Sequence, residues 1–138
     1  QQKGEGYITI KGKHNILDKI KNMINNAEKR IYISLSGKTL EAVLPQLSKA
    51  ILKGLKVVII TKAPFDLKGA VVYHSENKQN QIRLIVDSEK VLTGEIIDDS
   101  SSTCLYSRKQ NLVNLFKESL KNEIKLIELT NKERNDYL

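Results

Sequence analysis

The stretch from Gln81 to Gly94 constrains what this chain can fold into more than any other, because its pattern predicts two β-strands joined by a tight turn. Every second residue of the first strand is apolar, which gives that strand one wholly apolar face. Asp87 and Ser88 predict the turn, since short polar side chains bond the backbone there and tolerate unusual dihedral angles. The apolar pattern then resumes and ends at Gly94. The alternating apolar residues are Ile82, Leu84 and Val86, and the returning ones are Val91 and Leu92.

A strand–helix–strand unit is predicted before this hairpin. Residues 31–35 predict a strand, residues 40–51 an amphipathic helix, and residues 55–60 an apolar strand of the kind buried on both faces of a parallel sheet. Gly54 is placed to end the helix. Pro45 lies inside the helical pattern and is expected near the start of the helix or at a kink.

The rest of the chain completes an α/β domain. Residues 1–6 look like a linker remnant, and residues 7–138 are expected to form a single domain. Met23 and Cys104 are expected in its core. Further strands are predicted at residues 7–10, 70–73 and 103–106, the second of them at an edge of the sheet, and further helices at residues 16–27 and from Arg108 onward, the last broken near Asn122.

Composition favours a cytoplasmic protein. No apolar run reaches the roughly 18 residues that a membrane-spanning helix needs, and no signal peptide is evident before Lys13. Cys104 is the only cysteine, so it forms no internal disulfide, and no zinc-site spacing is present. We therefore expect neither membrane insertion nor a bound metal or cofactor.

Positive charge is concentrated in one part of the chain. Residues 11–68 hold 12 Lys and Arg against 4 Asp and Glu, which is +8, whereas the whole chain carries +7. This excess indicates an anionic partner or proximity to nucleic acid. The alternative is a lysine-rich solvated surface, which the scarcity of aromatic residues among the lysines favours.

The hairpin resembles the core hairpin of the phospholipase D fold. In that family it carries a His-x-Lys-x-x-x-x-Asp motif, and Asp87 fits the last position of the motif here. The His and Lys positions fall on Asn80 and Ile82, so the chemistry of the motif is absent. The resemblance implies a phospholipase D-like half-domain, with a mixed β-sheet flanked by helices on both faces, that is not an enzyme.

The order of the predicted elements resembles the C-terminal, effector-binding domain of TrmB-family transcriptional regulators. Members of that family carry an N-terminal winged-helix DNA-binding domain, a coiled coil and then this domain. The resemblance therefore implies an effector-sensing and dimerisation domain that contacts DNA only through a winged helix absent from this sequence. The matching stretches are residues 7–17, 27–34, 47–60 and 84–94.

Polar residues that follow two of the predicted strands suggest where a ligand binds. In open α/β sheets, ligands bind beyond the carboxyl ends of the strands. Hydroxyls there suit a sugar and positive groups suit an anionic substituent, so the expected effector is a sugar, a sugar phosphate or a small carboxylate. The alternative is that the lysines are only solvated and that Ser36 merely caps a helix. The candidate residues are Ser34, Ser36, Lys38, Thr61, Lys62, Arg83 and Asp87.

Two rival functions remain open at this point: a phosphodiesterase or nuclease of the same fold, and a structural dimerisation module without a ligand. Ser36-Gly37-Lys38-Thr39 lacks the earlier glycine of a phosphate-binding loop, since Tyr32 stands in its place. Ser34, Ser36 and Cys104 have no identifiable base for nucleophilic catalysis. A homodimer is expected, with residues 81–97 or the final helix as its contact.

Overall fold

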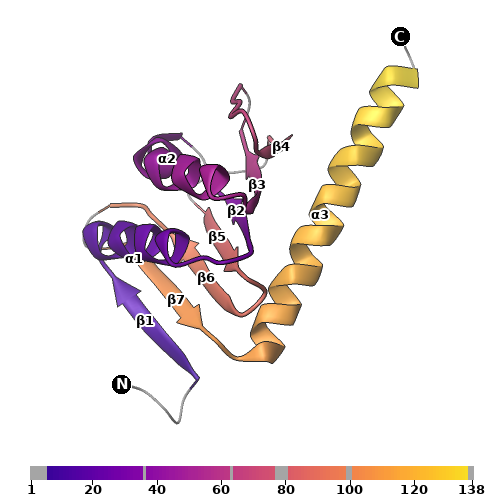
Figure 1. The fold of residues 1–138 in the computed structure, drawn as a ribbon. Helices are drawn as coiled ribbons and strands as arrows, with labels where there is room; N and C mark the ends of the chain where they lie inside the picture. The colour runs from indigo at the N-terminus through magenta and orange to yellow at the C-terminus, as the bar shows by residue number, and fades with distance from the viewer. Residues whose placement is uncertain (1–5, 36, 63, 77–80, 99–100, 137–138) are drawn as a thin grey trace.

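The computed structural model describes residues 6–35, 37–62, 64–76, 81–98 and 101–136, and it shows one seven-stranded sheet with three helices (Figure 1). The strands are β1 (Tyr7–Lys11), β2 (Arg30–Ser34), β3 (Lys56–Thr61), β4 (Val71–His74), β5 (Gln81–Val86), β6 (Lys90–Glu95) and β7 (Thr103–Ser107). The helices are α1 (Lys13–Asn25), α2 (Gly37–Leu52) and α3 (Gln110–Asp136).

The order of the strands in the sheet is β1-β7-β6-β5-β2-β3-β4. The predicted hairpin, β5 and β6, is therefore central, with β2 on one side and β7 on the other. β2 pairs with β3 and β3 with β4 in parallel, while the remaining pairs are antiparallel. The expected mixed sheet is confirmed, and so is the edge position of β4.

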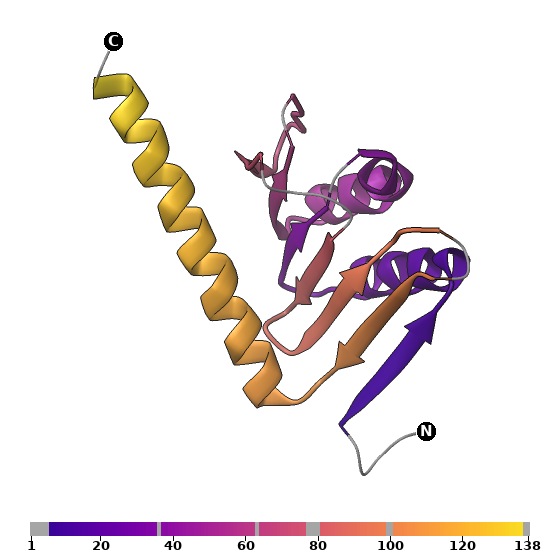
Figure 2. The same ribbon diagram turned by 180° about the vertical axis from the view of Figure 1, so that it is seen from behind.

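The two faces of the sheet are covered by different helices, which confirms the second part of the predicted fold. α1 and α2 pack side by side on one face, and α3 crosses the other (Figures 1 and 2). The larger core lies under α1 and α2, and a smaller one lies under α3, with Ile60, Ile85 and Val91 from the sheet and Val113 and Leu120 from α3. In both views the C-terminal part of α3 stands clear of the sheet.

The hairpin turn forms as predicted. Asp87 and Ser88 both adopt a φ of 56°, the left-handed conformation that short polar residues tolerate. Gly94 was expected to end the returning strand, but it lies within β6, between Ile82 and Cys104 in the register. A Cβ atom at Gly94 would clash with the Thr103 carbonyl oxygen, so the glycine allows the backbones of β6 and β7 to approach.

The structure tests the predicted break in α3, the place of Pro45 and the end of α2. α3 runs unbroken past Asn122, so the predicted break is wrong. The reason is that apolar residues continue at helical spacing on either side of Asn122, and no glycine or proline interrupts them. Pro45 lies in the interior of α2 and not near its start. Gly54, with a φ of 89°, follows the end of α2 as predicted.

Two predicted core residues are confirmed. Met23 is 4% exposed and Cys104 is 1% exposed. Burial raises the pKa of the Cys104 thiol to about 11, which keeps it protonated and unreactive near neutral pH. Within the described ranges, no helix is both long enough and apolar enough to span a membrane.

Candidate functional site

The carboxyl ends of β2 and β3 lie at the same end of the sheet, because the two strands are parallel neighbours. This end of the strands is the edge predicted from the sequence. Ser34 is the last residue of β2 and Thr61 is the last residue of β3. Lys38, in the first turn of α2, and Lys62, directly after β3, are both exposed near this edge. Ser36 lies outside the described residues.

Arg83 joins this edge from the hairpin. β5 runs antiparallel to β2, and their register places Arg83 opposite Ser34. Ser34 is fully buried, and among the described residues neither its Oγ atom nor the Nε atom of Arg83 has a hydrogen-bond partner. Buried polar atoms without partners are uncommon and costly, because they lose their hydration without replacing it. Two residues that are opposite in the register, Ser34 and Arg83, therefore each carry one such atom at the predicted edge.

The far end of the Arg83 side chain is held by α3. Its Nη2 atom lies 2.5 Å from Glu123 Oε1, and its Nη1 atom lies 3.4 Å from Ser119 Oγ. The Arg83 and Glu123 side chains are only 16% and 20% exposed. This ion pair joins the central hairpin to the helix that covers it. Sequence reasoning did not identify Glu123 or Ser119, because nothing local marks a contact across 40 residues.

Asp87 does not lie with the other candidate residues. It follows β5 at the opposite end of the sheet, where its carboxylate accepts hydrogen bonds from the backbone N–H groups of Glu28, Lys29 and Arg30 at 2.9, 2.7 and 3.0 Å. Partial burial raises the pKa of Asp87, but these three hydrogen bonds and the charge of Lys90 outweigh burial, so the pKa is lower than usual. Asp87 thus has a structural role: it fixes the start of β2 to the hairpin turn.

A hollow of ≈320 Å³ lies beside Arg83. Its polar groups come from neighbouring positions of β5 and β6 and include hydroxyl, amide and carboxylate groups besides the guanidinium. Such groups suit a ligand with hydroxyls or an anionic group. The lining residues are Gln81, Ile82, Arg83, Thr93, Gly94 and Glu95.

The described part of this site does not bring together the histidine and lysine side chains of the phospholipase D motif. Ile82, at the Lys position of the phospholipase D motif, is 1% exposed and belongs to the core beneath α1 and α2. Asn80, at the His position, lies outside the described residues. His74 is hydrogen-bonded through Nε2 to the Phe65 carbonyl at 2.9 Å, and His14 faces Asp18 at 3.2 Å on the surface of α1. Among the described residues, no group of His, Cys, Asp and Glu could hold a metal ion.

Comparison with known protein families and structures identifies relatives of this chain. The family model described as "Transcriptional regulator TrmB, EBD N-terminal subdomain" matches residues 6–124. No curated protein matches the sequence.

Several solved structures share the fold of this chain. TrmBL2, an archaeal chromatin protein described as showing a novel mode of DNA binding, is 19% identical with a TM-score of 0.71, over 91% of this chain and 54% of its own. Nuc from Salmonella typhimurium, a phospholipase D family member, is 16% identical with a TM-score of 0.66, over 84% and 93%. NucT from Helicobacter pylori is 14% identical with a TM-score of 0.65, over 86% and 95%. This chain thus spans about half the length of TrmBL2, and at these identities the likeness shows the fold alone.

Proposed function

This chain belongs to the TrmB family of transcriptional regulators, as the N-terminal subdomain of the effector-binding domain, and on that premise we propose that it senses a small-molecule effector and dimerises. TrmBL2, a structural relative, is a DNA-binding protein. In the regulator to which this chain contributes, DNA is contacted by a separate winged-helix domain, and the whole protein acts in the cytoplasm, where Cys104 stays reduced.

The effector is proposed to bind at the carboxyl edge of β2 and β3. The observation that carries this proposal is the pair of buried, unpartnered polar atoms, Ser34 Oγ and Arg83 Nε, at the edge where Lys38 and Lys62 stand exposed. A sugar, a sugar phosphate or a small carboxylate would supply the missing acceptors and meet the lysine charges. Ser36 and Thr61 complete the proposed site, and Asp87 is omitted because it lies at the other end of β5.

A thermal-shift screen of sugars, sugar phosphates and carboxylates tests this site. A ligand present at 100 times its dissociation constant should add about 2.7 kcal/mol to the free energy of unfolding. That gain should fall sharply in Lys38→Ala/Lys62→Ala. The control is Lys49→Ala/Lys53→Ala, which replaces one lysine in the last turn of α2 and one directly after the helix. Both lie away from this edge, so the gain should stay intact. A gain that survives unchanged in Lys38→Ala/Lys62→Ala would place the effector elsewhere.

We propose no enzymatic activity for this domain. The solved relatives include phospholipase D family members, so a phosphodiesterase is the second candidate. The isoleucine at the Lys position carries no charge to hold phosphate, and Asn80 is a poor nucleophile. Turnover of a chromogenic phosphodiester by the pure protein, abolished by Asn80→Ala, would contradict this part of the proposal.

Dimerisation is proposed to use α3. The hairpin was an equal candidate from sequence, but both of its strands are paired inside the sheet. Leu126 and Leu129, three residues apart on one face of α3, are 65% and 60% exposed. Leu115, 62% exposed, lies three turns earlier on the same face. A second copy that packs on this apolar stripe would cover it, and two-fold pairing is the commonest form of oligomer.

Sedimentation velocity at micromolar concentration tests the dimer. The unmodified domain should sediment as a dimer, and Leu126→Lys/Leu129→Lys should sediment as a monomer, because the charges prevent burial of the stripe. Leu52→Lys is the matched control, since it places the same charge at an 87% exposed leucine of α2. A monomeric unmodified domain, or a dimer that persists in the double variant, would contradict the assignment.

A further inference from the structure

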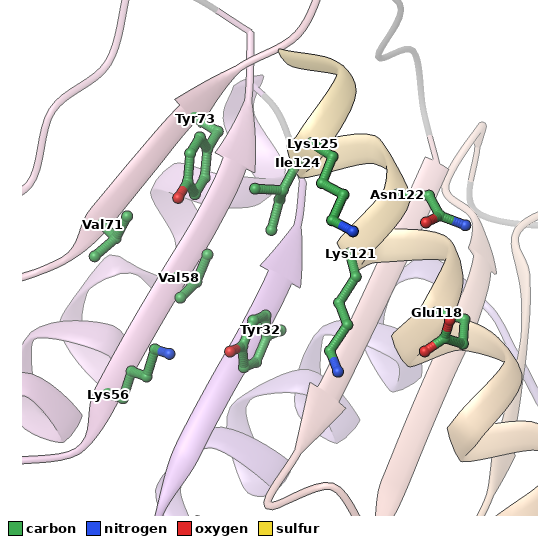
Figure 3. A pocket seen from close by; sticks show the side chains of 10 residues that line it. All are labelled: Tyr32, Lys56, Val58, Val71, Tyr73, Glu118, Lys121, Asn122, Ile124 and Lys125. Atoms are coloured by element: carbon green, nitrogen blue, oxygen red, sulfur yellow. The ribbon is translucent and has the colours of Figure 1, made fainter. Parts of the chain in front are cut away.

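A second hollow, of ≈520 Å³, lies between α3 and the strands β2, β3 and β4. Figure 3 shows side chains from the strands and side chains from α3 that face one another across it. Its volume falls within the range of small-molecule sites. The lining residues are Tyr32, Lys56, Val58, Val71 and Tyr73 from the strands and Glu118, Lys121, Asn122, Ile124 and Lys125 from α3.

The strand side of this pocket is aromatic and apolar. Tyr32 and Tyr73 come from β2 and β4, with Val58 of β3 between those strands (Figure 3). The Tyr73 hydroxyl donates a hydrogen bond to Glu128 Oε2 at 3.4 Å, which ties the ring to α3. Tyrosine rings offer flat apolar surface together with a hydroxyl, so this wall suits a ring-shaped ligand that carries polar groups.

Three lysines line the pocket, one on its strand side and two on its helix side. Lys56 opens β3 on one side, and Lys121 and Lys125 stand one helical turn apart on α3 on the other. With Glu118 as the one acid among the described lining residues, three positive charges and one negative charge give a net charge of +2. Lys56 Nζ lies 5.5 Å from the centre of the Tyr32 ring, so positive charge and aromatic surface are adjacent.

We propose that this pocket binds a small phosphorylated ring compound. The phosphate would lie among Lys56, Lys121 and Lys125, whose ammonium groups form charge-assisted hydrogen bonds with phosphate oxygens. The ring would lie against Tyr32 and Tyr73, and its hydroxyls would meet the amide of Asn122 and the carboxylate of Glu118. A nucleotide and a sugar phosphate share this chemistry: a nucleobase stacks on an aromatic ring, and a sugar packs its C–H face against one.

This pocket is distinct from the proposed effector edge. Lys56 is the first residue of β3, whereas Lys62 follows its last residue, so these two lysines lie at opposite ends of one strand. A ligand in this pocket is therefore additional to the proposed effector and does not depend on whether the edge binds one. Because α3 forms one wall, a ligand here would also hold the dimerisation helix against the sheet.

Isothermal titration calorimetry with four probes tests the pocket: AMP and glucose 6-phosphate, each beside its unphosphorylated counterpart, adenosine or glucose. At least one phosphorylated probe should bind, and neither neutral probe should bind measurably, because the lysines supply the attraction. Preference for AMP would identify the ring as a nucleobase, and preference for glucose 6-phosphate would identify it as a sugar. If neither phosphorylated probe binds, the proposal is wrong.

Variants locate the bound probe. Lys121→Ala/Lys125→Ala should raise its Kd by about tenfold or more, since both charge-assisted contacts are lost. Lys132→Ala removes an exposed lysine of α3 outside the pocket and should leave the Kd unchanged. Lys121, Lys125 and Lys132 are all exposed, so the fold should survive each change. A Kd unchanged in Lys121→Ala/Lys125→Ala but raised in Lys38→Ala/Lys62→Ala would overturn the pocket while supporting the effector edge.

Discussion

Replacing Asp87 with alanine should lower the free energy of unfolding of this domain by about 3 kcal/mol. The carboxylate accepts three backbone hydrogen bonds, from Glu28, Lys29 and Arg30, across 57 to 59 residues of sequence. A hydrogen bond to a charged group contributes roughly 1.5–3 kcal/mol. The total loss stays below the sum of three, because these N–H groups are near the surface and water can replace the carboxylate. Urea unfolding of the purified variant measures the effect.

Asp87→Asn separates the acceptor geometry from the charge. The two bonds to Oδ1 can persist in the amide, while the bond from Glu28 to Oδ2 is lost, so we expect about half the destabilisation of Asp87→Ala. An Asp87→Ala variant within about 0.5 kcal/mol of the unmodified domain would show that the carboxylate does not secure β2.

The contribution of Asp87 should also depend on pH. Its pKa is lower in the folded state than usual, so its stabilisation is complete above the unfolded pKa of about 3.9. That stabilisation is lost as the pH falls through the folded pKa, because the protonated acid no longer accepts the bonds as an anion. The difference in unfolding free energy between the unmodified domain and Asp87→Asn should therefore be constant from pH 7 to about pH 5 and shrink below about pH 4.

Replacing Arg83 with methionine should cost about 2–3 kcal/mol of unfolding free energy and loosen α3. Methionine fills similar space, but Glu123 is left without the cation that lies 2.5 Å from it in a largely desolvated place. Breaking a fully buried ion pair by removing one partner costs about 3–5 kcal/mol, and the residual exposure of this pair reduces that figure. Denaturant unfolding gives the cost, and amide hydrogen exchange along α3 shows the loosening.

A double-mutant cycle attributes the effect to the pair. Glu123→Gln alone should also destabilise the domain, and Arg83→Met/Glu123→Gln should cost less than the sum of the two single changes. Asp18→Asn, which breaks the exposed pair with His14, is the matched control and should change stability by less than about 0.5 kcal/mol. Strictly additive single changes would show that Arg83 and Glu123 do not depend on each other.

Much of the fold was predictable from local pattern. Alternating apolar residues in 81–86 identified a strand, and the polar pair Asp87-Ser88 identified the turn that follows it. Ser34 and Thr61 stand at the carboxyl ends of two strands that were expected to be parallel neighbours. That position predicted that they would share one edge. These features follow from side-chain periodicity and turn chemistry, which act within a few residues.

Other features depend on contacts that no local pattern records. Asp87 fitted the last position of a catalytic motif, yet its carboxylate is used to hold the start of β2. The break expected near Asn122 did not occur, because helical spacing continues and the sheet supports one side of α3.

The sequence alone determined the fold class, the hairpin and the edge that Ser34 and Thr61 share. Only the tertiary structure decided that Glu123 meets Arg83 and that Tyr32 and Tyr73 face the lysines of α3 across a pocket. The physical reason is separation along the chain: 40 residues divide Arg83 from Glu123, and only the packing of α3 on the sheet brings them together. Periodicity shows which face of an element is apolar, but it does not show which other element covers that face.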